Sequence, residues 1–230
     1  MKTNPLIVAL DVDTLDQATA LVRSLGDSVE IYKIGSQLFT AYGPQAVREL
    51  NSLGKKVFLD LKFHDIPNTV ANAVSSATAL NVFMMTVHTI GGLDMMEAAI
   101  ESAQTRSQAL KIARPLIVGV TVLTSAPNEE STQEVVLQRA AHAKRAGLDG
   151  VVASAQEISV LRENLGGEFL IVTPGIRPAG ADKSDQQRVA TPAQAIARGS
   201  NFLVVGRPIV EAASPREAAL GILNEIRAGQ

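Results

Sequence analysis

Short apolar runs alternate along this chain with longer segments that mix apolar and polar positions. The runs are rich in Val, Ile and Leu, and they do not alternate between apolar and polar residues. Such continuous runs are typical of parallel strands, which are buried on both faces. Eight of them are present, at 6–10, 31–34, 57–61, 82–87, 116–122, 150–152, 169–172 and 202–205. The pattern therefore predicts eight parallel strands.

The segments between these runs have the period of amphipathic helices. In 14–25, Thr14 stands where a helix cap is expected. The apolar residues that follow it share one helical face: Leu15, Ala18, Leu21, Val22 and Leu25. Segments 132–146, 190–198 and 215–228 are further predicted helices, and Asp94-Met95-Met96 predicts a helix start with core methionines.

Eight strands alternating with helices over 230 residues predict a (β/α)8 TIM barrel. We expect a single domain over residues 1–230, since no linker or low-complexity segment divides the chain. The alternative is a doubly wound open sheet. No Gly-x-Gly-x-x-Gly follows the first run, which weakens the dinucleotide-binding form of that fold.

Composition narrows the class of function. A net charge of -2 and 3% aromatic residues argue against a general binder of nucleic acid or anionic membranes. The chain has no cysteine, so it has no disulfide framework, thiol nucleophile or thiolate metal site, and its histidines, His64, His88 and His142, lack metal-ligand spacing. With no signal peptide and no apolar run of about 18 residues, we expect a soluble cytoplasmic protein.

Charged residues gather where the third predicted strand ends. Asp60 and Lys62 point to the same face of that strand, and Asp65 follows it. Active sites of barrels lie at these strand ends, and Lys33 on the second strand adds another cation. Such an array can press a carboxylate against a bound anion and hold an ammonium where a carbanion develops. The alternative is a salt-bridge network that closes the barrel end.

A second group of residues is typical of a phosphate site. The segments Gly175-Ile176-Arg177 and Gly206-Arg207 follow the seventh and eighth strands, where barrels often bind phosphate. Glycine permits close backbone approach, and a guanidinium adds paired hydrogen bonds. Turn glycines with solvated arginines are the alternative. The polar segment 178–188, which contains Gln186, is interpreted as a lid over the phosphate or as a surface loop.

Five other polar residues have two interpretations each. Asp11 ends the first strand, where it accepts bonds from sugar hydroxyls or caps the next helix. Thr124 and Ser125 meet a heterocycle edge or act as caps. His64 and His88 are interpreted as structural histidines in preference to catalytic ones.

The motif Asp60-x-Lys62-x-x-Asp65-Ile-Pro-Asn-Thr69 resembles the signature of the orotidine 5′-phosphate decarboxylase family, in its bacterial, monofunctional type. The extension after Asp65 is more specific than Asp-x-Lys-x-x-Asp, which related sugar-phosphate enzymes share. Other segments resemble the family in the same order: Leu10-Asp11, Lys33-Ile34-Gly35, Val87-His88, Gly91-Gly92, Val122-Leu123-Thr124-Ser125, Thr173-Pro174-Gly175-Ile176-Arg177, Asp185-Gln186 and Val205-Gly206-Arg207-Pro208.

The resemblance implies conversion of orotidine 5′-monophosphate to uridine 5′-monophosphate (UMP) and CO2, the last step of de novo UMP biosynthesis. It implies no metal and no organic cofactor, and a homodimer with sites at the interface. In it Lys62 is the general acid that protonates C6, and Asp60 with Lys33 completes the charged array. Lys33 and Asp11 bind ribose hydroxyls. Asp65 and Thr69 reach the neighbouring subunit's site.

The resemblance also implies contacts to the base and the phosphate. Thr124 with Ser125 lies near the pyrimidine. The phosphate is held by Arg207, the amides of Gly206 and Arg207, and Gln186, and Arg177 belongs to the same closing loop. Two alternatives stay open. One is a related metal-dependent sugar-phosphate decarboxylase or aldolase, and the other is a non-catalytic nucleotide-binding barrel.

Overall fold

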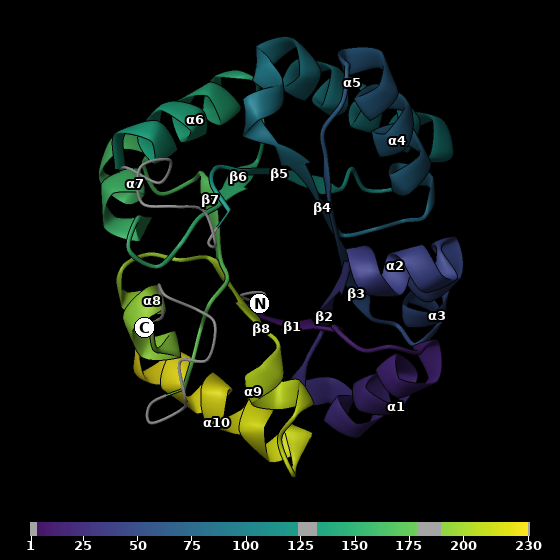
Figure 1. Ribbon diagram of the computed structural model, residues 1–230, viewed down its shortest axis with the longest axis vertical. Helices are drawn as coiled ribbons and strands as arrows, with labels where there is room; N and C mark the ends of the chain where they lie inside the picture. The colour runs from purple at the N-terminus through teal and green to yellow at the C-terminus, as the bar shows by residue number, and fades with distance from the viewer. Residues whose placement is uncertain (1–3, 124–132, 179–189, 230) are drawn as a thin grey trace.

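The computed structural model describes residues 4–123, 133–178 and 190–229. Eight parallel strands pair in chain order, and β8 pairs with β1, so the sheet is a closed barrel (Figure 1). The strands are β1 (Leu6–Ala9), β2 (Ile31–Gly35), β3 (Lys56–Phe63), β4 (Met84–His88), β5 (Leu116–Val120), β6 (Gly150–Val152), β7 (Leu170–Thr173) and β8 (Phe202–Val205). The predicted (β/α)8 barrel is confirmed, and the open sheet is not formed.

Helices surround the barrel (Figure 1). They are α1 (Leu15–Leu25), α2 (Ser36–Tyr42), α3 (Pro44–Ser52), α4 (Pro67–Ala79), α5 (Gly92–Leu110), α6 (Gln133–Arg145), α7 (Ile158–Leu165), α8 (Pro192–Ala197), α9 (Arg207–Val210) and α10 (Pro215–Ala228). Thr14 caps α1 as predicted, in a reciprocal pair of bonds with Gln17. Within the described ranges, no helix has the length and apolarity needed to cross a membrane.

The apolar runs are continuous because each strand contributes to two cores. A small core fills the barrel interior and includes Ile7, Phe58 and Met84. A larger core lies between the outer face of the sheet and the helices, and includes the predicted core methionines Met95 and Met96. A strand that is buried on both faces has no position left for polar alternation.

Strand β3 is longer than its neighbours and irregular. Leu59 pairs with Met85 and Phe63 pairs with Val87, so four steps along β3 correspond to two along β4. Within this stretch Lys62 has a φ of 53°, in the left-handed region that L-residues seldom adopt. The extra length is a β-bulge, a feature that re-aims side chains and is common beside active sites.

Two arginines join loops at the N-terminal ends of the strands. Arg114 forms a paired contact with Asp149, at 2.6 and 2.9 Å, and the amide of Ile117 donates to the same carboxylate at 2.7 Å. The hydrogen bond to Asp149 raises the pKa of Arg114. Arg162 donates to the carbonyl oxygens of Phe169 and Gly199. Residues at this face of a barrel serve stability rather than catalysis.

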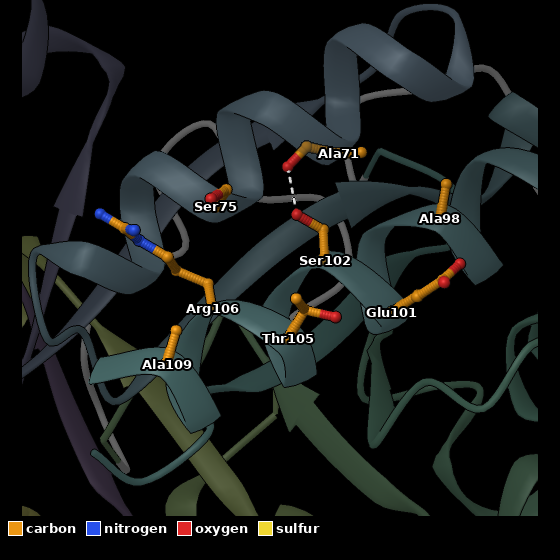
Figure 2. Close-up of a pocket in the computed structure, with 8 residues that line it drawn as sticks. All are labelled: Ala71, Ser75, Ala98, Glu101, Ser102, Thr105, Arg106 and Ala109. Carbon is orange, nitrogen blue, oxygen red and sulfur yellow. Dashed lines mark hydrogen bonds between the residues drawn. The ribbon is translucent and has the colours of Figure 1, made fainter. Parts of the chain in front are cut away.

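Small residues allow α4 and α5 to pack closely. Figure 2 shows their outer face, where Ser102 Oγ donates to the carbonyl oxygen of Ala71 at 2.5 Å. A groove of about 440 Å³ lies here, lined by Ala71, Ser75, Ala98, Glu101, Ser102, Thr105, Arg106 and Ala109. The close packing anchors α4, and so fixes the segment that joins it to β3.

Candidate active site

Four charged side chains alternate in sign at the C-terminal rim of β1 to β3. Lys62 Nζ lies 3.0 Å from Asp60 Oδ2, and Lys33 Nζ lies 3.7 Å from the same oxygen. Lys33 also contacts Asp11 Oδ1 at 3.1 Å. The side chains of Lys33 and Asp60 are only 12% and 14% exposed. The structure thus brings together three of the four predicted members, Lys33, Asp60 and Lys62, with one carboxylate oxygen between two ammonium groups, and the fourth charge is Asp11 in place of Asp65.

Three members of the array, Lys33, Asp60 and Lys62, form one wall of a cavity of about 160 Å³. The rest of the lining is apolar, from Phe58, Val120, Val122, Leu123, Val152, Pro174 and Val204. An apolar wall lowers the local dielectric constant and strengthens every charge interaction in the cavity. Sequence reasoning missed this wall because its valines look like ordinary barrel core. The available signal was their position near the ends of β5, β6 and β8.

Sequence reasoning also missed Thr86 on β4. Its Oγ1 donates to Asp60 Oδ1 at 3.0 Å and accepts from the backbone amide of Lys62 at 2.8 Å. The side chain is fully buried. A lone hydroxyl inside the apolar run 82–87 was the signal that could have found it, since buried polar groups need partners.

Asp11 does not cap the following helix. Thr14 is the cap of α1, so the predicted capping role of Asp11 is wrong, and its binding of sugar hydroxyls stays a prediction. Its carboxylate pairs with Lys33 and is 56% exposed. A Cβ placed on Gly35 would stand 3.0 Å from Lys33 Nζ. Glycine at that position therefore leaves room for the Lys33 ammonium beside Asp11.

Asp65 and Thr69 lie apart from the array. Asp65 Oδ1 accepts from the adjoining amide of Ile66 at 2.6 Å, and both Asp65 and Thr69 are exposed. Within the part of the chain that the structure describes, Asp65 forms no ion pair with Lys33 or Lys62. The exposure of both residues leaves them available to a second subunit.

The predicted phosphate segments meet the rim from β7 and β8. Gly175 has a φ of 73°, and the amide of Arg177 donates to the carbonyl oxygen of Ala190 at 3.0 Å. Arg177 is buried, so it is not the solvated arginine of the alternative interpretation. A Cβ on Gly206 would lie 3.7 Å from Asp11 Oδ2, which places the start of α9 beside the array.

Three predicted binding residues lie outside the described residues. They are Thr124, Ser125 and Gln186. The predicted lid at 178–188 also lies outside them, apart from Pro178.

His88 lies at the end of β4 with its ring centroid 5.7 Å from that of His64. Burial, followed by the charges of His64, Arg139 and Lys62, lowers the pKa of His88. Its Nδ1 is buried and has no hydrogen-bond partner among the described residues. These surroundings favour the neutral ring and agree with a structural interpretation.

Polar and charged side chains that converge on the C-terminal rim of a closed (β/α)8 barrel define an enzyme of the barrel class. Among the described residues, no group of three or more His, Asp or Glu side chains could hold a metal ion.

Comparison with known proteins gives the family within that class. Residues 4–222 match the model of the orotidine 5′-phosphate decarboxylase / HUMPS family. The chain belongs to this family. The family assignment agrees with the resemblance of the Asp60–Thr69 motif.

Curated relatives cover nearly the whole chain. The orotidine 5′-phosphate decarboxylase of Vibrio cholerae is 51% identical over 97% of this chain and 98% of its own length. That of Syntrophomonas wolfei is 49% identical over 96% and 97%. The crystal structure of orotidine 5′-phosphate decarboxylase from Lactobacillus acidophilus superposes with a TM-score of 0.85 at 39% identity, covering 97% of this chain and 99% of that one.

Proposed function

We propose that the protein decarboxylates orotidine 5′-monophosphate to UMP and CO2, as the last step of de novo UMP biosynthesis. The observation that carries this proposal is the Asp60 carboxylate held between Lys33 and Lys62 in a cavity with an apolar wall. The names of the curated relatives support the substrate.

The charges of Asp60 and Lys62 suit a reaction in which a substrate carboxylate leaves and negative charge develops on C6. The bond between C6 and the carboxylate carbon breaks, and its electron pair stays on C6. Lys62 Nζ then gives a proton to C6, and solvent returns one to the lysine. Asp60 repels the substrate carboxylate and holds Lys62 in place, while the apolar wall accommodates the departing CO2. Groups that are fixed before the reaction stabilise the developing carbanion without reorganisation, and such preorganisation is a major source of rate enhancement in many enzymes.

The remaining predicted residues bind the rest of the nucleotide. Asp11 and Lys33 bind ribose hydroxyls, and their ion pair at the open rim supports this role. Thr124 and Ser125 face the pyrimidine. The phosphate is held by Arg207, the amides of Gly206 and Arg207, and Gln186, and Arg177 belongs to the same closing loop. Because the phosphate is remote from C6, its binding energy is available to orient the reacting ring.

We also propose a homodimer in which Asp65 and Thr69 complete the neighbouring site. Both residues are exposed. Three large apolar side chains are exposed in the loops that follow β3, β4 and β5, at 65% for Ile66, 50% for Ile90 and 44% for Leu123. These side chains follow strands at the same rim as Asp65, so a second subunit that covers this rim would bury them. We further propose one domain over residues 1–230 that acts in the cytoplasm, where a charged phosphate ester is retained.

An ultraviolet assay for loss of orotidine 5′-monophosphate, run with a chelator, tests the proposal. Turnover that survives the chelator is the expected result. Turnover of a sugar phosphate that needs added Mg²⁺ would support the metal-dependent alternative instead. Tight binding of UMP with no turnover of either substrate would identify a non-catalytic barrel.

A further inference from the structure

We propose that Thr86 is the positioning residue of the proton donor: its one hydroxyl fixes both the Asp60 carboxylate and the Lys62 backbone. The inference rests on the proposed function in one respect, namely that Lys62 is the general acid. Thr86 lies on β4, and within the described ranges its side chain forms hydrogen bonds with two residues of the array, Asp60 and Lys62 on β3.

The Thr86 hydroxyl has one proton, so it donates one of its two hydrogen bonds and accepts the other. The Lys62 amide can only donate, so Thr86 Oγ1 accepts there, at 2.8 Å. The hydroxyl proton is then free to point at Asp60 Oδ1, 3.0 Å away. This arrangement matches an ionised Asp60, which only accepts. Because Thr86 is fully buried, no water competes for either bond.

The bond from the Lys62 amide to Thr86 Oγ1 takes the place of a backbone hydrogen bond of the sheet. Between Leu59 and Phe63 the register of β3 against β4 is shifted, and Lys62 has a φ of 53°. A backbone amide in such a bulge is left out of the regular ladder. The side chain of Thr86 gives it a partner, and so stabilises the left-handed conformation that directs Lys62.

The bond from Thr86 to Asp60 gives the two carboxylate oxygens of Asp60 different partners. Oδ1 receives the Thr86 hydroxyl, while Oδ2 faces Lys62 and Lys33. A carboxylate held through one oxygen cannot rotate about its last torsion without losing that bond. Thr86 therefore orients the Lys62 ammonium in two ways. It binds the backbone amide of Lys62, and it fixes Asp60, the ion-pair partner of the Lys62 side chain.

Two substitutions separate the hydroxyl from the volume of the side chain. Thr86→Val keeps the shape and removes both bonds, whereas Thr86→Ser keeps the hydroxyl. We expect Thr86→Val to lower kcat by about 100-fold, since small misplacements of reacting groups have effects of that order. KM and the affinity for UMP should change little. Thr86→Ser should retain most of the wild-type kcat.

A matched control is Thr78→Val. Thr78 is equally buried, but its Oγ1 donates to the carbonyl oxygen of Val74 within α4. This variant should keep the wild-type kcat. If Thr86→Val does not fold, Thr86→Ala removes the same hydroxyl without adding a methyl group in its place and serves for the same comparison.

Amide hydrogen exchange at Lys62 gives a readout that needs no substrate. Exchange should be faster in Thr86→Val than in the wild type, and unchanged in Thr86→Ser. Wild-type kcat and wild-type exchange in Thr86→Val would overturn the inference, and so would equal losses of kcat in the Val and Ser variants. A wild-type protein without decarboxylase activity would overturn the proposed function alone, because the exchange comparison would still report on Thr86.

Discussion

Lys62 Nζ approaches Asp60 Oδ2 to 3.0 Å although the two residues stand two positions apart on one strand. In a regular strand such residues are separated by about 6.6 Å and their side chains run parallel. The pair lies within the bulge of β3, where Lys62 has a left-handed backbone. The proposed chemistry therefore depends on two charges that stand in a distorted stretch of the strand.

Replacing Lys62 by alanine should remove the proton donor and leave the binding groups in place. We expect Lys62→Ala to lose nearly all turnover while its dissociation constant for UMP stays within about tenfold of the wild type, since ground-state binding does not need the acid. Steady-state kinetics and calorimetric titration give the two values. Lys56→Ala is the matched control, because Lys56 begins the same strand but pairs with Glu30 at the opposite end. Near-normal turnover in Lys62→Ala would contradict the assigned acid.

Mixing two inactive variants should restore activity if Asp65 serves the neighbouring site. A heterodimer of Lys62→Ala and Asp65→Ala would have one doubly defective site and one intact site. The expected activity of the mixture is well above that of either variant alone, as measured after the subunits are mixed and allowed to exchange. Absence of recovery in a sample with demonstrated heterodimers would show that Asp65 acts within its own subunit.

The stability of the protein should fall in mild acid because of His88. Burial lowers the pKa of His88 below 6.5, so the unfolded chain takes up a proton at a higher pH than the folded one. The free energy of unfolding should therefore decrease as the pH falls below 6.5, and it should be insensitive to this group well above that value. Urea denaturation of the wild type and of His88→Asn between pH 5 and 8.5 measures the difference. Parallel curves for the two proteins over the whole range would exclude His88 as the cause.

Breaking the ion pair at the N-terminal face should affect stability without affecting catalysis. Arg114→Met leaves Asp149, which is 17% exposed, without its paired partner, and we expect a loss of about 2 kcal/mol in the free energy of unfolding. The midpoint of urea denaturation reports the loss, and kcat at 25 °C should be that of the wild type. A fall in kcat while the protein remains folded would show that this face is coupled to the rim.

The sequence was sufficient for the strands, since a strand buried on both faces leaves an unbroken apolar run. It was also sufficient for the array of Lys33, Asp60 and Lys62, because the ends of neighbouring parallel strands meet at one rim. It was insufficient for Thr86 and for the bulge. Both depend on the register between β3 and β4, which is a property of two strands together. The apolar wall of the cavity was missed for a related reason. By residue type alone, Val120 and Val152 cannot be distinguished from valines deep in the core.

The left-handed backbone at Lys62 has an evolutionary consequence. A lysine in that conformation is less stable than glycine by about 1 kcal/mol, and asparagine also tolerates it better. Removing Lys62 would still leave Asp60 beside Lys33. A population selected for heat resistance alone should therefore replace Lys62 by glycine or asparagine, so retention of the lysine among thermotolerant descendants would record continued selection for turnover.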